Sequence, residues 1–203
     1  MRPAAIAALA CWLGSVPAAA AGPGEARILL VGDSTMAPRT GYGESLCGLF
    51  LWTAECANLA RGGRSTKSFR ADGSWDGVLA RLRSPAGNRP TFVLVQFGHN
   101  DQPGKAERTT DLETEYPANL ARYVDEIRRE GAEPVLVTPL TRRQFRDDGT
   151  LKDDLAPWAE AMRRVAREKK VPLLELHDRS AYVVGKMGSA RADGLAIDRK
   201  SVV

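Results

Sequence analysis

Three residues whose chemistry suits acyl transfer each follow a segment that the sequence predicts to be a β-strand: Ser34, Gly63 and Asn100. Ser34 offers a hydroxyl nucleophile, Gly63 a backbone N–H, and Asn100 an uncharged amide donor of the kind that stabilises an oxyanion. Each also has a structural interpretation, because serine caps helices, glycine permits tight turns and asparagine forms Asx turns. Their joint occurrence after successive strands favours catalysis.

The elements that would position these residues alternate between strand and helix along the chain. The clearest strand is the almost continuously apolar run at 91–97, which is typical of a parallel strand covered on both faces. Strands are predicted over 28–31, 56–60, 91–97, 134–138 and 172–176, and helices over 43–52, 74–82, 112–130 and 156–169. This alternation predicts an α/β fold, a three-layer α/β/α sandwich around a parallel sheet whose carboxyl edge carries the site.

The first 21 residues are predicted to be a secretory signal peptide and are excluded from the fold. Arg2 precedes an apolar stretch, and a run of alanines follows at 18–21. The segment is too short for a membrane-spanning helix, and lipid attachment at Cys11 is the alternative, although the residues before Cys11 match such sites poorly. We therefore expect a periplasmic or extracellular protein with no membrane partner and with one domain beginning at residue 22.

Charge and cysteine usage limit the partners. The 203 residues carry a formal net charge of +4, with acidic and basic residues interspersed, which predicts no nucleic-acid partner. Basic residues at 61, 64, 67 and 70 either attract an anionic substrate or form a solvated loop.

Cys47 and Cys56 either form a disulfide between the first helix and the second strand or remain buried thiols. We expect a monomer.

Three motifs resemble those of the SGNH (GDSL-like) hydrolases. They are GDST at 32–35, the glycine of GRS at 63–65, and GHND at 98–101. Longer segments resemble, more narrowly, the rhamnogalacturonan (pectin) acetylesterase branch of these enzymes, and they lie at 33–37, 63–69, 96–102, 134–139 and 142–143. The resemblance extends over nearly the whole chain after the leader.

The resemblance implies a flavodoxin-like five-stranded parallel sheet with Ser34 as the nucleophile. It implies an oxyanion hole made by the backbone N–H groups of Ser34 and Gly63 and by the side chain of Asn100. It also implies removal of acetyl groups from an acetylated pectic polysaccharide or oligosaccharide, without a cofactor or a metal. Arg64 and His99, which adjoin the oxyanion residues in the sequence, are the candidates for substrate contact.

The general base that this family carries near its C-terminus, in an Asp-x-x-His block, has no counterpart in the sequence. Two histidines are present. His99 is predicted to hold its own loop by hydrogen bonds, and His177, directly after the predicted fifth strand, is the alternative base. Asp193 and Asp198 have no histidine three residues later. We therefore expect severely reduced turnover.

The last residues are interpreted as a non-native tail. No helix pattern leads into them, and residues 198–203 are what the codons GAT CGG AAG AGC GTC GTG encode, which resembles a sequencing adapter read through to a stop. On this interpretation, 22–197 is a hydrolase domain that is incomplete at its C-terminus and lacks its last covering helix.

Two other functions remain open from the sequence. Another SGNH esterase would act on acetylated xylan or on a lipid ester, and a lipid would favour an apolar acyl tunnel over a broad polar groove. A non-catalytic carbohydrate-binding module would keep the groove without the chemistry.

Overall fold

A parallel five-stranded sheet forms the centre of the computed structural model, which describes residues 26–50 and 54–195. Its strands are β1 (Ala26–Gly32), β2 (Ala54–Asn58), β3 (Thr91–Gln96), β4 (Glu133–Val137) and β5 (Leu173–Leu174). They lie in the order β2-β1-β3-β4-β5, which is the flavodoxin-like order. The expected sheet is therefore confirmed. The predicted leader and tail lie outside the described residues.

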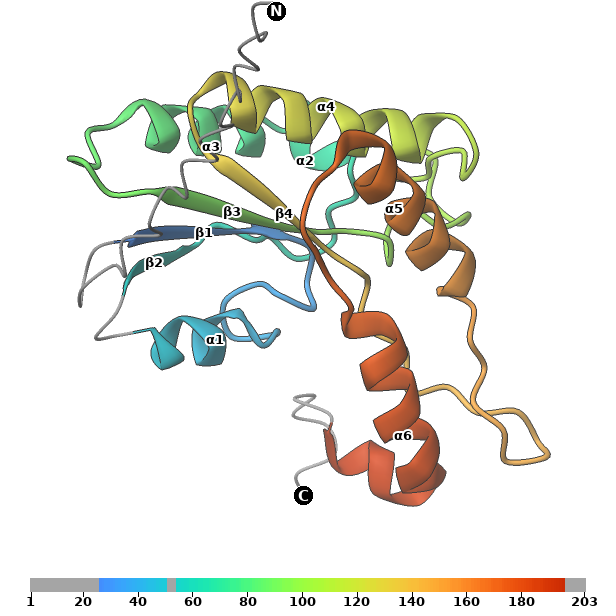
Figure 1. The fold of residues 1–203 in the computed structure, drawn as a ribbon. Helices are drawn as coiled ribbons and strands as arrows, with labels where there is room; N and C mark the ends of the chain where they lie inside the picture. Colours follow the sequence, from blue (N-terminus) through green and yellow to red (C-terminus); the bar gives the residue numbers. More distant parts are fainter. Residues whose placement is uncertain (1–25, 51–53, 196–203) are drawn as a thin grey trace, which may run out of the picture.

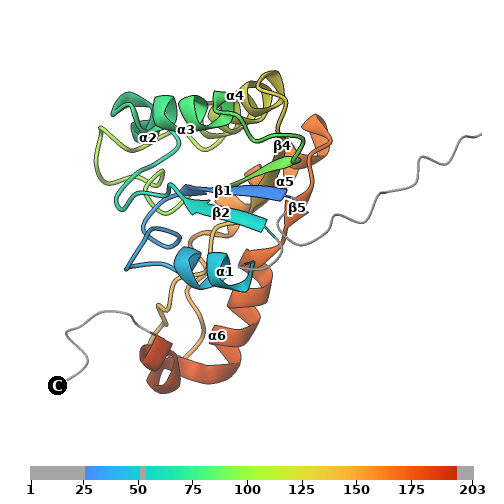
Figure 2. The same cartoon turned by 90° about the vertical axis from the view of Figure 1, so that its left-hand side faces the viewer.

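Helices cover both faces of this sheet. They are α1 (Gly43–Leu49), α2 (Ser68–Ala71), α3 (Ser74–Arg83), α4 (Glu115–Arg129), α5 (Ala156–Lys169) and α6 (Leu176–Ala192), with a 3-10 turn at Asp193–Leu195. Figures 1 and 2 show α2 to α5 on one side of the sheet, called here the upper face, and α1 and α6 on the other, the lower face. The three-layer sandwich is confirmed.

The central strands are apolar without interruption because both of their faces are buried. In β1, Leu29 and Val31 belong to the upper core, whereas Ile28 and Leu30 belong to the lower core, as the two-residue period of a strand requires. The upper core is the larger of the two and is rich in aromatic side chains, which come from α2, α3, α4, α5 and the loop that follows β3.

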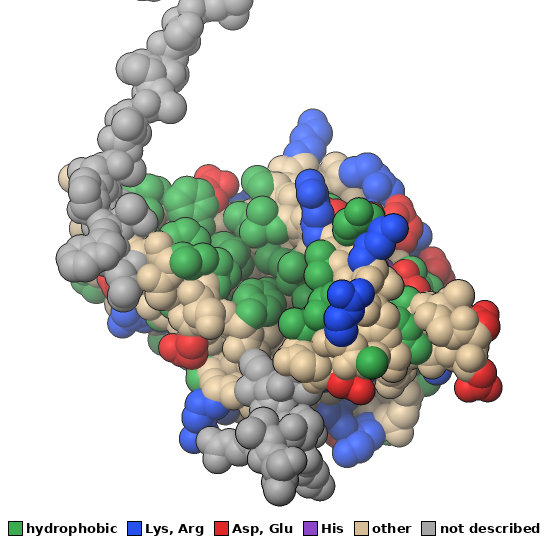
Figure 3. Space-filling view, turned by 90° about the horizontal axis from the view of Figure 1, so that it is seen from below, with side chains coloured by type: hydrophobic (Ala, Val, Ile, Leu, Met, Phe, Trp, Pro, Cys, Tyr) green, Lys and Arg blue, Asp and Glu red, His purple; other side chains and the backbone are tan. Residues whose placement is uncertain are grey.

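The lower face is covered more sparsely. Its core joins Leu94 of β3 and Val137 of β4 to Met36 and Ala37, which follow β1. The space-filling view from below shows hydrophobic side chains gathered over a broad area of this face, with Lys and Arg side chains beside them (Figure 3). Half-buried residues of α1 and its flanks pack against the small core.

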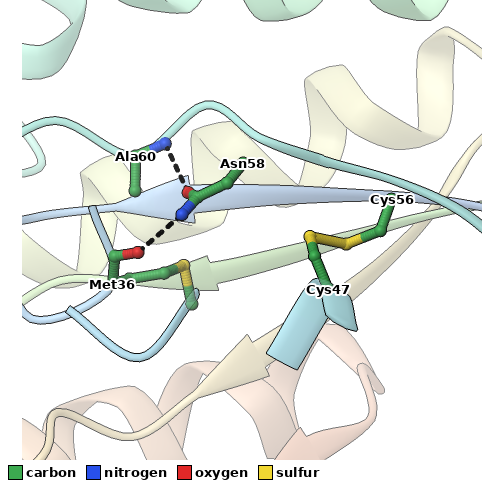
Figure 4. Close-up of a disulfide and its surroundings, with 5 residues drawn as sticks. All are labelled: Met36, Cys47, Cys56, Asn58 and Ala60. Atoms are coloured by element: carbon green, nitrogen blue, oxygen red, sulfur yellow. Dashed lines mark hydrogen bonds between the residues drawn. A yellow bond between two sulfur atoms is a disulfide. The ribbon is translucent and has the colours of Figure 1, made fainter. Parts of the chain in front are cut away.

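A disulfide between Cys47 and Cys56 joins α1 to β2 on this face (Figure 4). The two Cα atoms are 5.3 Å apart, within the range that a disulfide spans. The sequence left this pairing open, and the structure shows the bridge between first helix and second strand. The bond fixes the one helix that covers β1 and β2 from below.

The structure differs from the sequence prediction mainly at the C-terminal side. The predicted fifth strand, 172–176, contains only a two-residue strand, because Glu175 instead caps α6 by accepting a hydrogen bond from the Asp178 backbone N–H. No helix was predicted over α6, whose sequence lacks a continuous apolar stripe: its buried residues are His177, Val184 and Ala192. These few buried residues, rather than an amphipathic stripe along the helix, hold α6 against the rest of the fold.

Candidate active site

The candidate nucleophile, Ser34, lies in a tight turn directly after β1. Asp33 builds this turn: its Oδ1 accepts hydrogen bonds from the Thr35 backbone N–H at 2.9 Å and from Thr35 Oγ1 at 2.8 Å. Its carbonyl oxygen accepts from the N–H groups of Met36 and Ala37. An aspartate that bonds to the backbone two residues later is a local turn former, so the sequence itself sets the position of Ser34 at the end of the strand.

Polar side chains from other elements hold the turn from below. Tyr42 donates its hydroxyl to Gln96 Oε1 at 3.1 Å, and Thr35 Oγ1 lies 3.2 Å from the same oxygen. Burial, assisted by the nearby Asp33 carboxylate, raises the pKa of Tyr42, so its hydroxyl stays a donor. Asn58 donates from Nδ2 to the Met36 carbonyl oxygen at 2.8 Å (Figure 4).

Gly43 is required for this close packing. A Cβ at position 43 would lie 2.3 Å from the Met36 carbonyl oxygen and 2.4 Å from Asn58 Nδ2, so any side chain would separate α1 from the turn. The absence of a Cβ thus brings the start of α1 directly against the backbone that follows Ser34.

The structure brings together the three segments that carry Ser34, Gly63 and Asn100. The N–H of Arg61 donates to the Gly32 carbonyl oxygen at 2.9 Å, and a Cβ built on Gly62 would lie 3.8 Å from Ser34 Cβ. Asn100 Nδ2 donates to the Arg64 carbonyl oxygen at 3.0 Å. The loops after β2 and β3 are therefore joined to each other, and the first of them lies against Ser34.

The backbone donors expected to form an oxyanion hole are available. Within residues 26–50 and 54–195, the N–H groups of Ser34 and Gly63 donate no hydrogen bond to another residue. Gly63 adopts a φ of 74°, a conformation that favours glycine. The Asn100 amide uses one of its two hydrogens on Arg64 and keeps the other. This arrangement leaves up to three donors for a developing negative charge.

His99 lies beside the turn. Its Nδ1 is 3.5 Å from Asp33 Oδ2, and its carbonyl oxygen accepts a hydrogen bond from Arg142 Nη2 at 3.0 Å. The ring also lines a pocket of about 600 Å³, together with Thr35, Tyr42 and Arg143. Within the described residues, neither His99 Nδ1 nor Asp33 Oδ2 forms a hydrogen bond, so the role of this ring in holding its loop stays a prediction.

His177, the alternative base of the sequence analysis, is a buried anchor. Its side chain is 1% exposed, with Nδ1 3.0 Å from the Pro139 carbonyl oxygen and Nε2 3.0 Å from Asp153 Oδ1. Its backbone N–H donates to Thr138 Oγ1. Nε2 has no hydrogen-bond partner among the described residues, so this histidine ties α6 to the loop after β4 through Nδ1 and its backbone N–H. The structure gives no contact between it and Ser34 among the described residues.

The cluster of basic residues after β2 is largely neutralised. Arg64 pairs with Asp72 at 2.6 Å, Lys67 with Glu115 at 3.4 Å, and Arg70 with Glu126 at 2.8 Å. Arg61 is exposed. The sequence could not show these pairs, because the acidic partners of Lys67 and Arg70 lie on α4, far along the chain. Arg64 remains a candidate for substrate contact on its position alone.

The buried carboxyl of Asp101 holds the loop after β2, which carries Gly63, against the loop after β3, which carries Asn100. It accepts hydrogen bonds from the Thr66 backbone N–H at 3.0 Å and from Thr110 Oγ1 at 3.1 Å. Burial raises the pKa of Asp101 to about 7, although the hydrogen bonds from Thr66 and Thr110 oppose that change. This side chain joins the loop after β2 to both ends of the loop after β3.

Comparison with known proteins identifies the family. Residues 30–195 match the model of the GDSL-like Lipase/Acylhydrolase family. The chain belongs to this family. It is 32% identical over 157 residues to the rhamnogalacturonan acetylesterase RhgT of Bacillus subtilis (strain 168), a match that covers 74% of this chain and 64% of RhgT. It is 33% identical over 113 residues to a rhamnogalacturonan acetylesterase of Emericella nidulans, covering 55% and 42% of the two chains.

Solved structures of other proteins share the fold. The crystal structure of YxiM from Bacillus subtilis has a TM-score of 0.69 at 24% identity, covering 84% of this chain and 49% of that one. A variant of Axe2, an acetylxylan esterase from Geobacillus stearothermophilus, has a TM-score of 0.62 at 19% identity, covering 80% and 81%. The resemblance to SGNH hydrolases of the rhamnogalacturonan acetylesterase branch is thereby confirmed.

Several residues of this GDSL-like site were not found from the sequence. Tyr42 and Asn58 support the Ser34 turn, and Arg108 donates to both oxyanion loops. Arg108 lies in a charged loop without periodicity, so no spacing rule could single it out. For Asn58 a weak signal existed, since it is a polar residue in the middle of the strand predicted over 56–60.

No helix in the described part of the chain has both the length and the apolar character that crossing a bilayer requires. Over the same residues, no three His, Cys, Asp or Glu side chains are grouped so as to hold a metal ion.

Proposed function

We propose that this GDSL-like hydrolase is an acetylesterase that acts on acetylated rhamnogalacturonan, with Ser34 as its nucleophile. In this reaction Ser34 Oγ loses its proton to a base and forms a bond to the acetyl carbonyl carbon. The carbonyl oxygen becomes an oxyanion that the N–H groups of Ser34 and Gly63 and the Asn100 amide stabilise. The sugar oxygen leaves with a proton, and water then releases acetate from Ser34.

One observation carries this proposal: the N–H groups of Ser34 and Gly63 and one hydrogen of the Asn100 amide lie on adjoining loops at Ser34 and are not used by other residues within the described chain. Buried or half-buried backbone N–H groups are normally paired. Two such groups left open beside a serine, on a sheet edge where α/β proteins bind ligands, suit a charge that develops during reaction. The named acetylesterase relatives support rhamnogalacturonan as the substrate class.

The proposed reaction also needs a general base that takes the proton of Ser34 Oγ. Ser34 Oγ forms no hydrogen bond with another residue in the described part of the chain, and His99 and His177 contact Asp33 and Asp153. We therefore propose that this chain turns over slowly and that a small external base accelerates it. Imidazole has the proton affinity of a histidine side chain and would take the Ser34 proton in its place.

The predicted periplasmic or extracellular location belongs to the same proposal. A polysaccharide substrate is met outside the cytoplasm, and an oxidising compartment suits the Cys47–Cys56 disulfide. The predicted partner is an acetylated pectic polysaccharide or oligosaccharide bound by a monomer.

Acetate release from acetylated rhamnogalacturonan, measured with and without imidazole, tests the function. Wild type, Ser34→Ala and the matched Ser189→Ala variant on exposed α6 are compared, with acetylated xylan as the second substrate. The proposal expects release that imidazole raises, that Ser34→Ala abolishes and that Ser189→Ala leaves unchanged, with rhamnogalacturonan preferred. Equal release by Ser34→Ala would exclude this nucleophile, a preference for xylan would reassign the substrate, and binding without any release would favour a carbohydrate-binding module.

A further inference from the structure

Arg108 contacts both loops of the proposed oxyanion hole with one nitrogen. Its Nη1 donates to the Gly63 carbonyl oxygen at 3.1 Å and to Asn100 Oδ1 at 3.1 Å. The side chain is 22% exposed, so these charge-assisted hydrogen bonds are partly shielded from water. A Cβ on Gly63 would lie 3.3 Å from the same nitrogen, which shows how closely the guanidinium approaches the glycine.

The chain holds Arg108 at this point through a closed loop. The Thr110 N–H donates to the Asp101 carbonyl oxygen at 2.9 Å, and the Arg108 N–H donates to the Lys105 carbonyl oxygen at 2.9 Å. Thr109 Oγ1 donates to the Gln102 carbonyl oxygen at 3.1 Å. The loop therefore begins and ends beside the buried Asp101, and its side chain at 108 points back across Asn100 to Gly63.

Two hydrogen bonds define the orientation of the Asn100 amide. Oδ1 accepts from Arg108 and Nδ2 donates to the Arg64 carbonyl oxygen. A flipped amide would place its NH₂ group against the guanidinium, donor to donor, and its oxygen against the Arg64 carbonyl. Only the observed orientation leaves the second Nδ2 hydrogen for an oxyanion. Without Arg108, one of the two constraints on this orientation is lost.

Nη1 of Arg108 also restrains the backbone at Gly63. Gly63 has no side chain and a left-handed φ of 74°, so its peptide planes rotate easily unless they are held. The bond from Arg108 to the Gly63 carbonyl oxygen restrains the residue whose N–H is a proposed oxyanion donor. In addition, Oδ1 of the Asn100 side-chain amide accepts a hydrogen bond from this cation, which makes Nδ2 of the same amide a stronger donor, and the positive charge lies close to the developing negative one.

We propose that Arg108 is a positioning residue that sets the Asn100 amide and the Gly63 peptide in their oxyanion-binding geometry. This inference rests on the proposed function. It predicts that loss of Arg108 weakens binding of the transition state more than binding of the ester, so that kcat falls while KM changes little.

The experiment compares wild type, Arg108→Ala, Arg108→Lys and the matched control Lys105→Ala, which removes a positive charge from the same loop. Hydrolysis of p-nitrophenyl acetate in imidazole buffer gives kcat and KM, and low concentrations of guanidinium ion are added to each protein. Arg108→Ala should lose about 10- to 100-fold in kcat, with KM within about threefold, and guanidinium should restore part of it. Arg108→Lys should lie between, and Lys105→Ala should match wild type.

A second measurement decides the inference if the variant folds poorly or if wild type proves inactive. The Asn100 side-chain NH₂ resonances in ¹⁵N spectra report the amide orientation without turnover. They should shift or broaden in Arg108→Ala and Arg108→Lys but not in Lys105→Ala. Three results would overturn the inference: unchanged Asn100 resonances, a rise in KM without a fall in kcat, or an equal fall in kcat in Arg108→Ala and Lys105→Ala. Absence of Ser34-dependent hydrolysis in wild type would instead overturn the proposed function.

Discussion

The two faces of the sheet are built in different ways. On the upper face, aromatic rings from three elements interlock: Trp75 and Tyr123 meet edge to face at 4.6 Å between ring centroids, and Tyr123 stacks on Phe97 at 5.7 Å. On the lower face, a seven-residue helix and the Cys47–Cys56 disulfide cover β1 and β2. Large apolar side chains such as Tyr182 and Val183 of α6 are exposed there.

The larger core therefore lies on one face of the sheet, and the turn that carries Ser34 packs on the other. The upper core anchors β3 and the loop that carries Asn100, whereas Met36 and Ala37 of the Ser34 turn belong to the sparse lower core. Hydrogen bonds from Tyr42 and Asn58 hold that turn together with the buried side chain of Met36. We expect the upper face to dominate the free energy of unfolding, and four measurements test that expectation.

The largest loss in the free energy of unfolding should follow Glu126→Gln on the upper face. Burial raises the pKa of Glu126, but hydrogen bonds from Arg70 and Trp75 outweigh it and lower the pKa to about 2. The change leaves Arg70 half-buried without its counter-charge, a loss of about 3–5 kcal/mol in urea unfolding. Glu130→Gln, directly after the same helix, is the matched control, because its partner Arg83 is exposed, and it should lower the free energy of unfolding much less. Equal losses would contradict the expectation.

The pH dependence of unfolding should carry a contribution from Asp101 that falls as pH rises. Its pKa is raised from 3.8 to about 7 in the folded protein, so between about pH 4 and 7 the folded state keeps a proton that the unfolded state has lost. This contribution therefore decreases across that window, by at most about 4 kcal/mol. Asp101→Asn retains an acceptor oxygen and should remove this slope in urea unfolding at several pH values. An unchanged slope would assign the effect elsewhere.

On the lower face, the Cys47→Ser, Cys56→Ser double variant should lose about 2–3 kcal/mol, the loop-closure contribution of a disulfide between residues nine apart. Reducing agent should lower the melting temperature of wild type toward that of the variant and leave the variant unchanged. If reduction has no effect on wild type, the disulfide does not compensate for the sparse lower core.

The smallest effect should come from α6. Val183 is 51% exposed, so Val183→Ala should change the free energy of unfolding by less than about 0.5 kcal/mol. The matched change on the upper face, Val124→Ala, removes the same atoms from a fully buried position and should cost about 2 kcal/mol. A comparable loss at both positions would mean that α6 packs as tightly as α4.

Much of the fold could be predicted because local patterns determine it. The unbroken apolar runs that became β1 and β3 indicated buried parallel strands, and the long amphipathic segments that became α4 and α5 indicated helices. α6 escaped prediction because its sequence has no apolar stripe, and β5 was overestimated because Glu175 caps that helix. The placement of Ser34, Gly63 and Asn100 after three adjacent strands followed from the same patterns.

By itself, the sequence determined the alternation of strands and helices, the turn that Asp33 forms around Ser34, and the residues offered at the carboxyl edge. Only the tertiary structure decided that Cys47 bonds to Cys56, that two basic residues after β2 find acidic partners on the distant helix α4, and that Arg108 reaches both Gly63 and Asn100. The physical reason is range. Turn formation and apolar periodicity act between neighbours in the chain, whereas ion pairs, disulfides and shared hydrogen bonds depend on which segments the packed core brings together.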